Sequence, residues 1–123
     1  MFSIDEVNEM LDEVAAELPK EVFRDLNGGV SLLPETRLSK SDPDGRLYTL
    51  GEYRRDQMGR YIVIYYGSFC AVHGGSSRSK MVGHLRRVLK HELTHHLESM
   101  AGERDLEIED EKQLEKYLNR KGD

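Results

Sequence analysis

The residues best suited to chemistry lie close together in the chain: His91, Glu92 and His95, in the sequence H-E-L-T-H. Residues four apart on a helix lie one above the other, so the two imidazoles can bind one metal ion. The glutamate next to the first histidine lies beside that ion and can accept a proton from a water molecule. Zn²⁺, the expected cofactor, lowers the pKa of a bound water to about 7. The pattern therefore predicts peptide-bond hydrolysis, with Glu92 as general base.

The surrounding sequence favours a functional motif over a coincidence. With 5 histidines and 14 glutamates in 123 residues, H-E-x-x-H arises in roughly 2% of shuffled chains. Residues 79–100 repeat apolar side chains at helical spacing, which predicts an amphipathic helix carrying the motif on the flank of its apolar stripe. Two surface histidines on a solvated helix edge remain the alternative interpretation.

The region around the motif is similar to a known family. Residues 91–96 read H-E-x-x-H-H, and Gly102–Asp105 reads G-x-x-D. In these features the chain resembles the small bacterial zincin-like metallopeptidases, a family of minimal zincin domains. The resemblance is densest over residues 60–110. It implies a zinc-dependent peptidase fold in which an edge strand runs beside the active-site helix.

The third metal ligand is less clearly marked than His91 and His95. No histidine follows His96, so a ligand further along the chain must supply oxygen. The G-x-x-D match favours Asp105, and the competitors are Glu103, Glu107 and Glu109. Glu98, three residues beyond His95 on the same helix, is less suited to close the coordination.

The spacing after His95 departs from the metzincin-type pattern. That pattern places a glycine three residues after the second histidine, whereas Gly102 follows His95 by seven. The four added residues make about one helical turn and move the bend by about 6 Å along the axis. Whether Asp105 still reaches the metal is therefore open.

The predicted elements place the motif in an α+β domain, a minimal zincin-like domain that spans residues 1–123. A capping box, Ser3 with Glu6, starts an N-terminal helix over residues 4–18. Strands are predicted at 30–33, 47–53 and 60–66, the last two as a hairpin in a small, mostly antiparallel sheet. A long active-site helix over 79–100, ending near Ala101-Gly102, and a short C-terminal helix over 105–118 complete the domain.

Several other side chains have ordinary structural interpretations. His96 projects onto the apolar stripe, which predicts a core histidine bonded to a backbone carbonyl. His84 is interpreted as solvated or capping. Tyrosines 61, 65, 66 and 117 could stabilise an oxyanion, but aromatic residues of this kind are more often packed.

Composition restricts the class of protein. The 18 basic and 23 acidic residues give a net charge of −5, which argues against general affinity for nucleic acid or anionic membranes. No run approaches the roughly 20 apolar residues of a membrane-spanning helix. A single cysteine, Cys70, excludes a disulfide framework. We expect a cytoplasmic protein without a secretory signal.

The predicted partner is a peptide or unfolded protein, laid along residues 60–66 as an edge strand in a shallow, open groove. A second protein could complete that groove. Two other functions stay open: a non-catalytic zinc-binding interaction domain, and a metal-dependent endoribonuclease. The second is disfavoured because the small bacterial rRNA-processing family with a helical histidine triad lacks the glutamate, and because this chain is acidic.

Overall fold

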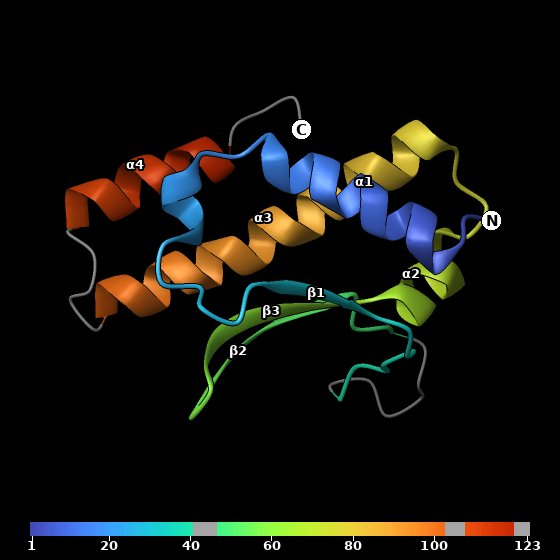
Figure 1. The fold of residues 1–123 in the computed structure, drawn as a ribbon, viewed down its shortest axis with the longest axis horizontal. Helices are drawn as coiled ribbons and strands as arrows, with labels where there is room; N and C mark the ends of the chain where they lie inside the picture. Colours follow the sequence, from blue (N-terminus) through green and yellow to red (C-terminus); the bar gives the residue numbers. More distant parts are fainter. Residues whose placement is uncertain (41–46, 103–107, 120–123) are drawn as a thin grey trace.

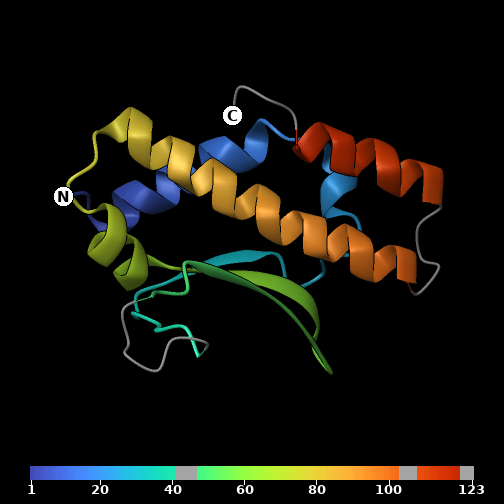
Figure 2. The same cartoon turned by 180° about the vertical axis from the view of Figure 1, so that it is seen from behind.

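Helices lie over one face of a small sheet in this α+β structure (Figures 1 and 2). The computed structural model describes residues 1–40, 47–102 and 108–119. Helix α3 (Arg78–Gly102) crosses the sheet, and both α1 (Ile4–Ala16) and α4 (Ile108–Leu118) pack against it. A short 3-10 helix, η1 (Lys20–Phe23), follows α1. The α+β layout predicted from the sequence is confirmed.

The sheet has three strands in the order β1-β3-β2. They are β1 (Val30–Leu33), β2 (Gly51–Asp56) and β3 (Gly59–Tyr65). Strands β2 and β3 form the predicted antiparallel hairpin, but β1 pairs with β3 in parallel. The sheet is therefore mixed, and its longer pairing is antiparallel, in agreement with the mostly antiparallel sheet that the sequence predicts.

The identity of the edge strand differs from the prediction. The sequence predicts residues 60–66 at the edge, yet β3 is central because β1 pairs with its second side. The backbone N–H of Ile62 donates to the carbonyl of Gly29 at 2.9 Å on that side. The edge strand that packs against α3 is β2. A peptide added to the sheet beside the active-site helix would therefore pair with β2.

Helix α1 docks on α3 through an apolar stripe and two ion pairs. Its start is the predicted capping box, in which the Ser3 hydroxyl accepts from the Glu6 backbone and the Glu6 carboxylate accepts from the Ser3 backbone. The guanidinium of Arg86 donates to both carboxylate oxygens of Glu17 at 2.9 Å. The α-helix ends at Ala16, two residues before the predicted end, because Pro19 disfavours helical backbone at Leu18.

One helix was missed from the sequence: α2 (Tyr66–His73) starts directly where β3 ends. Two turns of helix offer too few apolar repeats to reveal a period. Helix α3 confirms the predicted long helix and ends at Gly102, at the predicted stop. Residues 105–107 of the predicted last helix lie outside the described residues. None of the helices in the described parts of the chain is both long enough and apolar enough to cross a membrane.

Strand β2 lies close to α3 at Gly51. A Cβ atom built on Gly51 would lie 2.8 Å from Cγ1 of Val88 and 3.1 Å from Cδ1 of Ile64. Real Cβ atoms do not approach other atoms at 2.8 Å, so a side chain here would push the strand and the helix apart. The absence of a side chain at Gly51 thus sets the spacing between the edge strand and the helix that carries the motif.

Replacing Gly51 by alanine should lower the free energy of unfolding by about 1–3 kcal/mol, the cost of overpacking a core contact. The Val88 side chain does not easily move away from an added Cβ atom, because a β-branched side chain has one preferred rotamer in a helix. Gly83→Ala on α3 is the matched control, because a Cβ there meets nothing within 4 Å. That change should raise stability by about 1 kcal/mol through helix propensity. Urea unfolding measures both, and an unchanged midpoint for Gly51→Ala would contradict the packing argument.

Candidate active site

The two histidines of the motif lie together on the surface of α3. His91 and His95 are both exposed on α3, and their Nε2 atoms lie 3.2 Å apart. The rings meet edge to face, with centroids 4.7 Å apart. Two nitrogens bound to one tetrahedral zinc ion, at 2.0–2.1 Å each, would be separated by about 3.4 Å. The pair therefore fits a shared zinc ion without rearrangement of the helix.

Glu92 lies beside this pair and is held against strand β2. Its side chain is buried, with 7% of the residue exposed, and its carboxylate accepts the backbone N–H of Tyr53. Burial raises the pKa of the Glu92 carboxyl, while the two neighbouring imidazoles and the Tyr53 N–H act in the opposite direction. The motif thus places a proton acceptor at the edge of the sheet, next to the two histidines.

The predicted third ligands fall where no side chain is described. Asp105, Glu103 and Glu107 lie outside the described residues, and the side chain of Glu109 is likewise not described. Among the described residues, no three His, Cys, Asp or Glu side chains form a group that could hold a metal ion. Helix α3 continues about 10 Å along its axis beyond His95 to reach Gly102. The predicted ligand Asp105 and its competitors therefore stay predictions.

His96 is the core histidine that the sequence predicts. It is fully buried, and its Nε2 lies 2.7 Å from the carbonyl oxygen of Arg24, to which it donates. The Nδ1 atom therefore accepts from the hydroxyl of Tyr53, at 3.0 Å. Burial lowers the pKa of the His96 imidazole. His96 thus ties α3 to β2 and to the segment after η1, and both of its nitrogens are used.

Three hollows surround the motif. One of about 700 Å³ runs along β2, lined by Tyr53, Glu92, His95, Glu98 and Ser99, with Gly51 and Glu52 of the strand. A second of about 330 Å³ shares Gly51 and Glu92 with the first and extends towards the start of β2. A third, also about 330 Å³, lies on the side of α4 and includes Leu118 and Asn119. Together the first two hollows make a groove between β2 and α3 with Glu92 at its middle.

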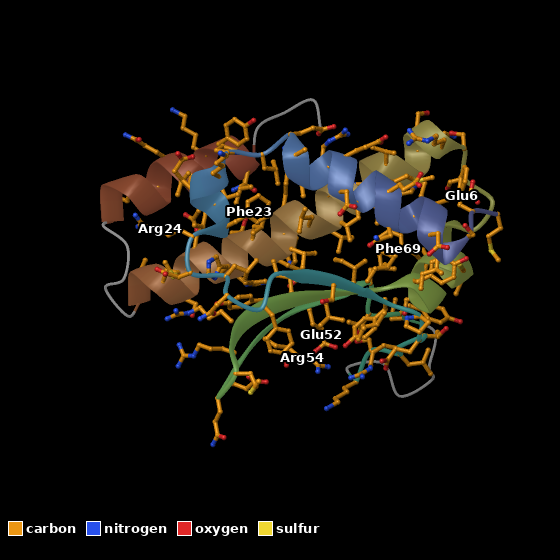
Figure 3. The ribbon with its side chains drawn as sticks, in the orientation of Figure 1. Glu6, Phe23, Arg24, Glu52, Arg54 and Phe69 are labelled. Atoms are coloured by element: carbon orange, nitrogen blue, oxygen red, sulfur yellow. The ribbon has the colours of Figure 1, made fainter. Side chains whose placement is uncertain are left out.

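The tyrosines named from the sequence are all packed away from this groove. Their hydroxyls donate to nearby acceptors: Tyr61 to Asp56, Tyr65 to Glu52, Tyr66 to the Phe2 carbonyl and Tyr117 to the Glu17 carbonyl. Glu52 and Arg54 lie on the sheet face away from α3 (Figure 3). Sequence reasoning missed Tyr53, which faces α3 instead. Side chains alternate between the two faces of a strand, so Tyr53 lies on the opposite face of β2 from Glu52 and Arg54. This alternation would have pointed to Tyr53 once the face of β2 that meets α3 was known.

His84 does not join the site either. Its ring stacks on that of His73 from α2, with centroids 3.6 Å apart and planes 15° from parallel. Burial lowers the pKa of both imidazoles, and the positive charge of Arg87 adds to this effect. The stack belongs to the contact between α2 and α3, and neither ring lines the hollows described above.

Among solved structures, the chain is similar to a conserved hypothetical protein from Thermo thermophilus. The two share 30% identity with a TM-score of 0.69, over 82% of this chain and 99% of that chain. The chain belongs to the family of that protein. No protein-family model and no curated protein matches it. Membership of this family establishes the shared fold, and a hypothetical protein brings no activity with it.

The contact between Tyr53 and His96 can be tested by removing one hydroxyl. Tyr53→Phe leaves the buried Nδ1 of His96 without a donor, which should lower the free energy of unfolding by about 1–3 kcal/mol. Tyr61→Phe is the matched control, because its hydroxyl bonds to Asp56 at an exposed position. That change should stay within about 0.5 kcal/mol. Equal effects of the two changes in urea unfolding would contradict the buried hydrogen bond.

Proposed function

We propose that this protein is a zinc-dependent metallopeptidase. The observation that carries the proposal is the 3.2 Å separation of the His91 and His95 Nε2 atoms, directly beside the buried carboxylate of Glu92. His91 and His95 would hold the ion. Asp105 is the first choice for a third ligand, and Glu103, Glu107 and Glu109 are its competitors.

The residues of the site divide the chemistry between them. When bound, zinc makes a water molecule more acidic and polarises the carbonyl oxygen of a peptide bond. The Glu92 carboxylate accepts the proton of the attacking water and returns it to the leaving amine. The Tyr53 N–H, donating to that carboxylate, keeps it turned towards the groove. Glu92 therefore acts from a fixed position, which general acid–base catalysis requires.

Strand β2 offers the substrate a backbone to pair with. The Ile62 N–H donates to the Gly29 carbonyl, just before β1, so Ile62 and its partner Tyr53 form a non-hydrogen-bonded pair. The backbone groups of Tyr53 and Gly51 therefore point away from β3 and towards the groove. Because the Tyr53 N–H donates to Glu92, the groups that a peptide can pair with here are the Tyr53 carbonyl and the backbone of Gly51. An extended peptide can add to such an edge. We infer that the substrate is a peptide or an unfolded segment of protein, and that a second protein could complete the open side of the groove.

Zinc content tests the site directly. Protein purified without added metal or chelator should contain close to one zinc per chain by elemental analysis. His95→Ala should lose this zinc, whereas His84→Ala, a histidine of the same helix outside the site, should keep it. Absence of zinc in the natural protein, even after zinc is offered, would contradict the proposal.

Glu92→Gln tests the chemistry separately from the metal. This variant should bind zinc as the natural chain does, yet cleave a denatured protein about 10²–10⁴-fold more slowly, the usual contribution of a general base. Glu98→Gln, an exposed carboxylate lining the same hollow, is the matched control and should change the rate only a few-fold. Zinc binding with no cleavage that depends on Glu92 would instead favour the non-catalytic interaction domain.

A further inference from the structure

The second hollow beside the motif differs in chemistry from the first. It lies between the residues that lead into β2 and the first half of α3, and holds about 330 Å³. Its surface is more apolar than polar, and its lining comes from both elements: Tyr48, Thr49, Leu50 and Gly51 on the strand side, and Arg87, Val88, His91 and Glu92 on α3. The lining of the first hollow is richer in polar groups, with Glu98, His95 and Ser99. The two ends of the groove therefore suit different side chains.

Gly51 shapes this apolar hollow. A Cβ atom built on Gly51 would lie 2.8 Å from Cγ1 of Val88, so strand and helix lie close together here. The hollow that these two residues line also includes Tyr48 and Leu50. Leu50 and Val88 are both partly buried and pack against the core, so they form a fixed apolar surface. Arg87 also lines the hollow, and its guanidinium contacts Nδ1 of His84 at 3.3 Å.

The position of the hollow relative to Glu92 determines which side chain of a bound peptide it can accept. Glu92 and Gly51 line both hollows, so a peptide bond bound over Glu92 has one hollow on each side of it. Side chains of an extended peptide alternate along the strand and stand perpendicular to its backbone pairing. A residue next to that peptide bond can therefore place its side chain between Leu50 and Val88.

We propose that this hollow, formed by Tyr48, Leu50, Gly51 and Val88, binds an apolar side chain of a residue adjoining the bond that is cleaved. The inference rests on the proposed function and gives it a substrate class: peptides with an aliphatic or aromatic residue at one fixed position. The Arg87 guanidinium is directed to His84, and a polar or charged side chain placed between Leu50 and Val88 would lose its water without gaining a partner from either of them. Removing a methylene from the bound side chain should slow cleavage by roughly 10-fold or more.

The experiment uses the zinc-loaded full chain and a mixture of peptides from a denatured proteome, with cleavage sites read by mass spectrometry. We expect Leu, Ile, Val, Met or Phe to be enriched at one position next to the cleaved bond. Val88→Phe should fill the hollow and shift the preference at that position to small residues. Tyr48→Ala, at the outer part of the hollow, should shift it to larger ones.

Val72→Phe is the matched control, because Val72 is 47% exposed on α2 and does not line the hollow. It should leave the cleavage pattern unchanged. Cleavage that depends on Glu92 but shows no apolar preference, or a preference that both Val88→Phe and Tyr48→Ala leave in place, would overturn the pocket and leave the peptidase standing.

A binding measurement tests the apolar hollow independently of the cleavage reaction. Zinc-loaded Glu92→Gln is titrated with two blocked peptides, Gly-Gly-Leu-Gly-Gly and Gly-Gly-Ser-Gly-Gly, while backbone amide shifts are followed by NMR. The leucine peptide should bind more tightly and move the signals of Leu50, Gly51 and Val88. Equal binding of the two peptides, or shifts elsewhere, overturns the pocket. Selective binding without any cleavage by the natural chain supports the pocket and contradicts the peptidase.

Discussion

The buried hydrogen bond between His96 and Tyr53 fixes how strand β2 sits on helix α3, and the whole groove depends on that placement. His96 is fully buried, its burial lowers the pKa of the imidazole, and its Nε2 donates to the carbonyl of Arg24. A buried imidazole with both nitrogens bonded has one tautomer and one orientation. The Tyr53 hydroxyl must therefore meet it in one place, and the Tyr53 backbone N–H then falls on Glu92. One tyrosine thus links the core histidine to the proposed base.

The helical period divides the motif between solvent, strand and core. His91 and His95 are exposed on one line of α3, while Glu92 and His96, one residue further on, are buried. Leu93 continues the rotation into the core that α3 shares with α1. Because each residue turns by about 100° around the axis, three consecutive positions can serve metal binding, proton transfer and packing without competing. The second histidine of the H-H pair, His96, is packed in the core.

The features that could be predicted from the sequence are those set by residues close together in the chain. The capping box at Ser3, the long helix and the buried role of His96 follow from spacing within a few residues, and all are confirmed. The parallel pairing of β1 with β3 joins residues about 32 apart, and no short pattern announces it. Residues 60–66 were wrongly predicted as the edge strand because this pairing was not predicted. Tyr53 was missed for a similar reason, since its partner His96 lies 43 residues away. Whether Asp105 is a ligand stays a prediction.

In an open groove, the backbone and the side chains of a bound peptide contribute differently to binding. Pairing with the β2 backbone uses groups that every peptide carries, so it provides affinity without choosing a sequence. Selection must then come from the side chains that line the groove. Gly51 lets strand and helix lie close together, since a Cβ atom there would lie 2.8 Å from Val88 and 3.1 Å from Ile64. The residue without a side chain thus holds β2 close enough to α3 for Glu92 to reach the strand. Beside it lies the apolar hollow in which our proposal places a side chain of the substrate.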